Sequence, residues 1–127
     1  MVLETVPNVS EGRRAGTLTA LAATCESPDA HLLNVSSDPS HNRTVLTVAG
    51  TPGGLHDAML ALVAAAVAQI DLRQHQGAHP RLGAVDVMPF VPLAGSTMAD
   101  AIALARRFAG AVADACGLPV YLYDEAA

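Results

Sequence analysis

The sequence predicts a single α+β domain in which helices cover one face of a mainly antiparallel sheet. Along the chain, segments in which polar and apolar residues alternate are followed by segments in which apolar residues recur at helical spacing. Two β-rich segments, 31–36 and 43–50, flank a short polar turn, which predicts an antiparallel hairpin. The length of 127 residues, 51% of them hydrophobic and 15% charged, suits one globular unit. We therefore treat residues 1–127 as one domain.

The first half of the chain predicts a strand, a loop, a helix and the hairpin. Val2–Val6 alternates in polarity and ends at Pro7, which predicts a short strand followed by a loop. Ser10 is predicted to cap a helix whose apolar face carries Leu18, Leu21, Ala22 and Cys25. After the break at 27–29, the strands His31–Ser36 and Arg43–Gly50 form the hairpin.

The second half predicts two further helices and two further strands. Apolar residues recur at helical spacing over 55–70, and a polar loop follows over 71–83. Val85–Val91 predicts a strand in which Pro89 implies an edge position or a bulge. Ser96 or Thr97 is predicted to cap a helix over 98–116. Val120–Tyr123 is predicted as the final strand. The order contains the ferredoxin-like β-α-β-β-α-β unit, followed by one more helix and strand.

Composition and charge exclude several classes of protein. The net charge of −5, with no Trp, two Tyr and two Phe, argues against nucleic acid as a partner. The N-terminus has no basic stretch before an apolar run, and the longest apolar stretch, 58–68, is shorter than the about 20 residues that cross a bilayer. We expect a cytoplasmic protein that binds no membrane, with Cys25 and Cys116 reduced and buried.

His75 and His79 are four residues apart, the spacing that places two imidazoles on one face of a helix for zinc. Gly77 between them and Pro80 after them argue against a helix, and no third ligand is near in the sequence. We therefore expect no metal site at these histidines.

The loop QGAHPRLG (76–83) places His79 directly before Pro80, which confines the backbone of His79 to extended angles. An unperturbed imidazole, with a pKa of about 6.5, is suited to accept a proton at neutral pH. His79 is therefore a candidate general base. From the residues alone, a structural hydrogen-bonding role for this histidine remains the alternative.

Two further segments carry candidate binding residues. The turn SHNRTV (40–45) places Asn42 and Arg43 at the hairpin, where Arg43 can form a forked contact with a substrate carboxylate. The alternative is an ordinary turn in which Asn42 adopts a left-handed conformation. The segment VPNVSEG (6–12) leads from a strand toward a predicted helix N-terminus, whose free N–H groups attract anions. Its glycines match no nucleotide-binding pattern.

Four blocks in order, VPNVSEGR, SHNRTVLTVAGTP, IDLRQHQGAHPRLGAVDVMPFVPL and GLPVYLYDEAA, closely resemble the N-terminal subdomain of the glutamate formimidoyltransferase (formiminotransferase) family. The resemblance covers essentially the whole chain. It implies transfer of the formimino group of N-formimino-L-glutamate to N5 of tetrahydrofolate in histidine breakdown, with folate as co-substrate and no metal. It also implies that His79, in the H-P-R motif, is the general base.

The same resemblance suggests which residues bind the substrates. Arg43 and Arg81 become candidates for the substrate carboxylates. Polar contacts are expected from the strand and loop residues Asn8, Ser10, Ser36 and Asn42.

The chain differs from the family pattern at several acidic positions. Where the family usually reads L-D-V-D, residues 33–36 read L-N-V-S, so that Asn34 and Ser36 replace two acids. A third acid, beside the base, is replaced by Ala78. Because an amidinium substrate and an imidazolium both favour a nearby carboxylate, reduced or altered activity is expected.

The family's transferase unit has two similar subdomains that hold folate in the groove between them, and the sequence corresponds to the first. Three alternatives follow: a fragment, a chain completed by a C-terminal subdomain in trans, or a non-catalytic ferredoxin-like binding or assembly module. We also expect a homo-oligomer.

Overall fold

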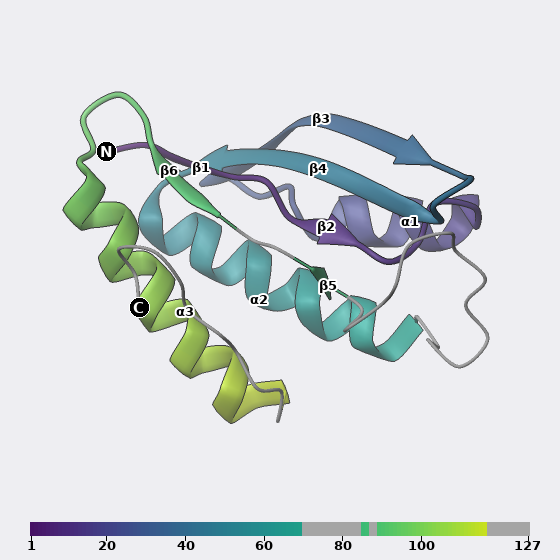
Figure 1. Cartoon of the computed structure of the whole chain (residues 1–127). Coiled ribbons are helices and arrows are strands. Elements are labelled where there is room, and N and C mark those ends of the chain that lie inside the picture. The colour runs from purple at the N-terminus through teal and green to yellow at the C-terminus, as the bar shows by residue number, and fades with distance from the viewer. Residues whose placement is uncertain (70–84, 87–88, 117–127) are drawn as a thin grey trace.

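The computed structural model describes residues 1–69, 85–86 and 89–116. Three helices lie on the same side of a six-stranded sheet (Figure 1). The helices are α1 (Ala15–Ala23), α2 (Pro52–Gln69) and α3 (Met98–Cys116). The strands are β1 (Leu3–Thr5), β2 (Asn8–Val9), β3 (Ala30–Asp38), β4 (Arg43–Gly50), β5 (Val85–Asp86) and β6 (Phe90–Pro92).

Every strand pair in this sheet is antiparallel. β4 pairs along one side with β3 and along the other with β1 and β2, which continue each other along the chain. β6 then pairs with β1, and β5 with β2. The interrupted first strand therefore lies between the hairpin and the interrupted fourth strand. This arrangement, with helices on one face only, confirms the predicted ferredoxin-like α+β fold.

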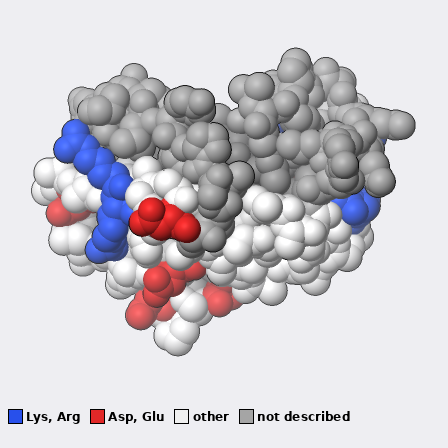
Figure 2. All heavy atoms as spheres, turned by 90° about the horizontal axis from the view of Figure 1, so that it is seen from below, with Lys and Arg blue, Asp and Glu red and all other residues white. Residues whose placement is uncertain are grey.

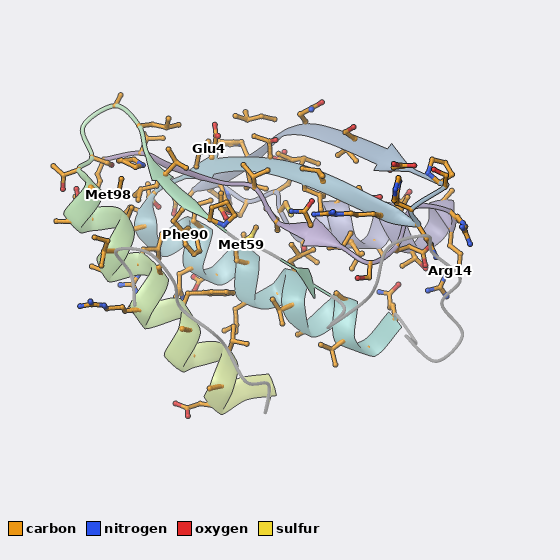
Figure 3. All side chains as sticks on the ribbon, viewed as in Figure 1. Glu4, Arg14, Met59, Phe90 and Met98 are labelled. Atoms are coloured by element: carbon orange, nitrogen blue, oxygen red, sulfur yellow. The ribbon has the colours of Figure 1, made fainter. Side chains whose placement is uncertain are left out.

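The core lies between the sheet and the helices. On β4, Leu46 and Val48 are buried against the helical layer, and Met59 and Leu62 of α2 are fully buried beneath them. Figure 3 shows Met59 and Phe90 between the sheet and the helices, whereas Glu4 points away from the helices. This burial leaves the opposite face of the sheet uncovered by any of the described helices, and we call it the open face.

The segment between the first strand and α1 differs from the prediction. The chain forms β2 at Asn8–Val9, and α1 begins at Ala15, so Ser10 is not its N-cap. Contacts with the hairpin explain the delay: the hydroxyl of Thr44 donates to the carbonyl oxygen of Glu11 over 2.6 Å, and the N–H of Gly12 donates to Asn42 Oδ1 over 2.8 Å. These tertiary hydrogen bonds hold the segment in a non-helical conformation.

The remaining predicted elements are present with shifted ends. α2 begins at Pro52, where the missing N–H of proline is tolerated. β3 extends to Asp38 and contains a bulge between Leu32 and Asn34. The predicted strand 85–91 is divided into β5 and β6, and Thr97, not Ser96, caps α3. The final strand, Val120–Tyr123, and the loop over 71–83 lie outside the described residues.

Candidate functional site

The strand registers place four residues in one line across the open face. Ser36 pairs with Val45, Val45 pairs with Asn8, and Asn8 pairs with Asp86. Residues directly opposite each other share a face of the sheet. Val45 lies between Thr44 and Leu46, which are buried on the helical side, so this line lies on the open face. We call these four residues the cross-strand row.

Arg43 joins the row through a hydrogen bond to Asn8. Its Nε donates to Asn8 Oδ1 over 3.2 Å, and Asn8 as a whole is only 8% exposed. The amide oxygen of Asn8 binds the guanidinium of Arg43 only at Nε. Among the described residues, none accepts a hydrogen bond from the two terminal nitrogens of this guanidinium, so their N–H groups are available to a ligand. This fork suits a carboxylate.

The hairpin turn that precedes Arg43 is fixed by local hydrogen bonds. Asn42 has a φ of 51°, the left-handed conformation expected of the alternative, an ordinary turn, and its side chain is buried against Gly12. His41 Nδ1 lies 2.6 Å from Asp38 Oδ2. Hydrogen bonds from His41 first, and from Ser40, hold the pKa of Asp38 at about 2, below its ordinary value of 3.8. The turn therefore presents Arg43 from a defined position.

The loop between β2 and α1 connects this turn to the end of α2. Arg13 Nε donates to the carbonyl oxygen of Pro39 over 2.7 Å, and Arg14 Nη2 donates to that of Gln69 over 3.0 Å. Glu11, with a side chain 3% exposed, accepts hydrogen bonds from the N–H groups of both arginines and pairs with the guanidinium of Arg14. Burial alone would raise the pKa of Glu11, but these hydrogen bonds outweigh it and lower the pKa.

The structure brings together part of the predicted site. Asn8, Ser36 and Arg43 share the open face, whereas Ser10 is buried in the β2–α1 loop. His79 and Arg81 lie outside the described residues. The backbone register also sets Asp86 opposite Asn8, a pairing that the sequence alone did not predict.

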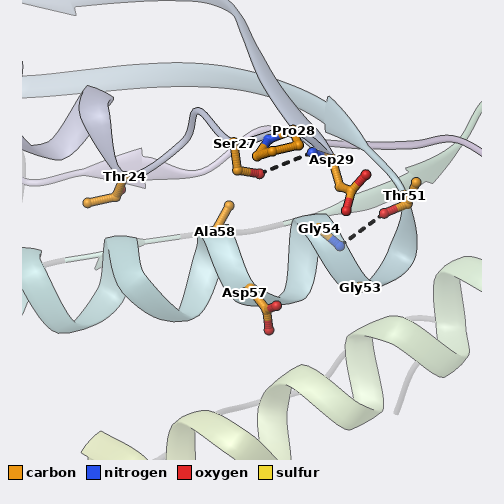
Figure 4. Close-up of a pocket in the computed structure, with 9 residues that line it drawn as sticks. All are labelled: Thr24, Ser27, Pro28, Asp29, Thr51, Gly53, Gly54, Asp57 and Ala58. Atoms are coloured by element: carbon orange, nitrogen blue, oxygen red, sulfur yellow. Dashed lines mark hydrogen bonds between the residues drawn. The ribbon is translucent and has the colours of Figure 1, made fainter.

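A separate cavity of about 460 Å³ lies between residues 24–29 and the first turns of α2 (Figure 4). Asp29 and Asp57 line it, together with Thr51, whose side chain accepts the N–H of Gly54 over 3.0 Å. Because Thr51 already caps the helix, and two carboxylates repel anions, this cavity is a poor site for a carboxylate-bearing ligand. It contains none of the predicted site residues.

Figure 2 views the molecule from its helical side. The described basic side chains visible there lie at two separate places, with acidic ones between them, so this view shows no continuous basic surface among the described residues. In the described part of the chain, no three His, Cys, Asp or Glu side chains gather around a metal position, and His75 lies outside it. Among the helices described, none has the length and apolarity to span a bilayer.

Residues 2–127 match the family described as formiminotransferase domain, N-terminal subdomain. The chain is 43% identical to the formimidoyltransferase-cyclodeaminase of Sus scrofa over 127 residues, which is 99% of this chain and 24% of that protein. It is 39% and 42% identical to the glutamate formimidoyltransferases of Streptococcus pyogenes serotype M1 and Thermoplasma acidophilum, again over 99% of this chain and over 42% of each relative. The chain thus spans less than half the length of these relatives.

Proposed function

The chain belongs to the formiminotransferase family, as its N-terminal subdomain, and from this premise we propose that it supplies half of a formimino-transfer site. The donor is N-formimino-L-glutamate, the acceptor is N5 of tetrahydrofolate, and the reaction is a step of histidine breakdown. The observation that carries the proposal is the Arg43–Asn8 hydrogen bond, which holds a guanidinium fork on the open face that also carries Ser36 of β3.

The open face supplies one wall of the site. A folate-sized ligand needs walls on both sides, because small-molecule sites bury most of their ligand's surface. The relatives named glutamate formimidoyltransferase are more than twice as long as the matched region. The second wall in this proposal is a C-terminal formiminotransferase subdomain, in the same polypeptide or in trans.

The chemistry requires one base. N5 of tetrahydrofolate attacks the amidine carbon, and His79 accepts the N5 proton as the tetrahedral intermediate forms. The bond from that carbon to the glutamate nitrogen then breaks, and His79 returns the proton to the departing amine. Arg43 and Arg81 bind substrate carboxylates in this scheme. Asn8 and Ser36 supply polar contacts, whereas Ser10 and Asn42 support them from buried positions.

A second candidate function is a binding or assembly module without turnover. It is favoured by Asn34 and Ser36, which pair with Thr47 and Val45 on the open face and bring no charge there. Both residues stand where the family usually has an acid. In this alternative the fold is retained while the chemistry is lost.

A reconstitution experiment tests the proposal. The chain is mixed with the C-terminal subdomain of a glutamate formimidoyltransferase relative, and transfer from N-formimino-L-glutamate to tetrahydrofolate is followed. We expect turnover in the mixture, little from the chain alone, and a loss of about 10²–10⁴ in rate for His79→Ala. His75→Ala is the matched control and retains the rate.

Three results decide between the alternatives. No turnover in the mixture, although the two subdomains associate, contradicts the transferase proposal and supports the module. Full activity from the chain alone refutes the need for a second wall. An active mixture that is unaffected by His79→Ala refutes His79 as the base.

A further inference from the structure

The strand β3 lies at the outside of the sheet and has one free edge. It pairs with β4 along one side, and no described strand pairs with its other side (Figure 1). The strand is nine residues long, and its residues Leu33 and Val35 are 59% and 43% exposed. Because an edge strand presents unpaired N–H and C=O groups to other chains, this edge is a candidate surface for association.

The hydrogen bonds of β4 show which residues of β3 face the free edge. The N–H of Leu46 donates to the carbonyl oxygen of Pro7 over 3.0 Å, so the backbone groups of Leu46 point away from β3. Val35 lies opposite Leu46 and therefore forms a non-hydrogen-bonded pair with it. The N–H and C=O groups of Val35 point to the free edge, and so do those of Ser37, two residues further along the strand.

The protection of this edge ends before Val35. The N–H of Leu32 also points outward, and it donates to the carboxylate of Glu26 over 2.7 Å. The bulge follows between Leu32 and Asn34. Charged side chains and bulges are common means by which edge strands avoid pairing with other chains. Beyond the bulge, residues 34–37 carry no charge, so neither means protects the rest of the edge.

The spacing of the outward groups suits an identical strand. When two copies of β3 run antiparallel about a two-fold axis at Ser36, Val35 lies opposite Ser37 of the partner subunit, and both such pairs exchange N–H···O bonds. Ser36 then lies opposite Ser36 of the partner subunit, in a non-hydrogen-bonded pair without charge. Asp38 lies opposite Asn34 of the partner subunit, which keeps the two Asp38 residues about 13 Å apart along the strands.

We propose that two copies of this chain associate in this register, so that β3 joins their sheets into one. The partner is a second copy because an identical strand supplies outward groups at the same spacing, adds no charge, and brings the exposed Val35 side chains of the two copies within reach of each other. The two-fold axis is perpendicular to the sheet, and the open faces of both copies therefore lie on the same side. The inference is independent of the proposed transfer reaction.

A cysteine placed on the axis tests the register. In Ser36→Cys the two new thiols belong to a non-hydrogen-bonded pair, about 4.5 Å apart at Cα, which a disulfide can bridge. In Asn34→Cys, on the same face of the same strand, the Cα separation is about 13 Å, which a disulfide cannot bridge. On oxidation, followed by non-reducing electrophoresis, Ser36→Cys should form the linked dimer about tenfold faster than Asn34→Cys. The wild-type chain, which retains Cys25 and Cys116, gives the background.

Sedimentation equilibrium tests the association itself. The wild-type chain should form a dimer with a dissociation constant of about 10–100 µM, because one strand pair makes a small interface. Ser36→Asp places two carboxylates opposite each other and should weaken the dimer about tenfold. Val35→Pro removes an outward N–H, which the β3–β4 pairing does not use, and should also weaken it. Ala64→Asp adds the same charge at an exposed position of α2 and should leave the dissociation constant unchanged. Circular dichroism checks that each variant is folded.

Three results overturn the inference. A wild-type chain that stays monomeric up to about 1 mM lacks such an interface. A dimer that Ser36→Asp does not weaken forms through another surface. Equal cross-linking of Ser36→Cys and Asn34→Cys contradicts the register. If Val35→Pro does not fold, the other variants still decide.

Discussion

Replacing Gly12 by alanine should unfold the chain more easily, because there is no room for a side chain at this position. A Cβ on Gly12 would lie 2.5 Å from the backbone nitrogen of Arg43 and 2.7 Å from the carbonyl oxygen of Asp38. Both neighbours are backbone atoms, so the loop must move away from the hairpin. Overpacking costs about 1–3 kcal/mol, and loss of the hydrogen bond from Gly12 N to Asn42 Oδ1 costs about 0.5–1.5 kcal/mol.

The sum, about 1.5–4.5 kcal/mol, is a large part of the stability of a domain of this size. In urea, with a slope of about 2 kcal/mol per molar, the unfolding midpoint measured by circular dichroism should fall by about 1–2 M. Gly110→Ala is the matched control, since its Cβ would meet nothing within 4 Å and the residue lies inside α3. That substitution should raise stability by about 0.5–1 kcal/mol. Equal midpoints for Gly12→Ala and the wild type would refute the close contact.

Three further substitutions have expected outcomes. His41→Ala should raise the pKa of Asp38, measured by NMR, from about 2 toward 3.8, because the hydrogen bond from His41 is the main cause of the depression. Since the folded pKa lies below the ordinary one, this pair stabilises the turn above about pH 4, and the contribution is lost as the pH falls toward 2; an unchanged pKa contradicts the assignment. Thr97→Ala removes the cap that accepts the N–H of Asp100 and should cost about 0.5–2 kcal/mol in urea unfolding. Leu62→Ala should cost about 2–5 kcal/mol, whereas Val67→Ala, at a 43% exposed position of the same helix, should cost far less; similar costs would contradict the packing of α2.

Hydrophobic periodicity predicted the elements whose burial is regular. β4 alternates between the helical side and the open face over its whole length, and its bounds, Arg43–Gly50, are those predicted. α2 buries the predicted residues Leu55, Met59 and Leu62 on one side. In both cases the pattern of side chains in the sequence directly reflects contact with a single layer, so local reasoning suffices.

The first residue of α1 and the presence of strand β2 are determined by contacts with residues that are distant in the sequence. The segment 10–14 binds the hairpin turn through partners about 30 positions away, such as Asn42 with Gly12 and Thr44 with Glu11. No local pattern reveals that such bonds outweigh the helix-capping preference of Ser10. The β2 strand, two residues long, is likewise defined by its pairing with β4.

The sequence predicted which residue types form the candidate site, but it did not predict how these residues are arranged in space. Asn8 and Arg43 were selected because they lie in motifs that resemble the family, and Ser36 because it stands where the family usually has an acid. The structure brings all three to one face. The pairing of Asp86 with Asn8 was not predicted, because the sequence of one strand does not determine its register with the next. The register itself depends on which hydrophobic sets meet across the sheet.

The most direct test of the proposed site locates the donor on the surface of the chain. The ¹⁵N-labelled chain is titrated with N-formimino-L-glutamate, and its backbone amide shifts are followed by NMR. We expect the largest changes at Asn8, Arg43 and Ser36, on the open face, and no change at Asp29 and Thr51, at the cavity beside α2. Changes concentrated at Asp29 and Thr51, with the open-face residues unaffected, would contradict it.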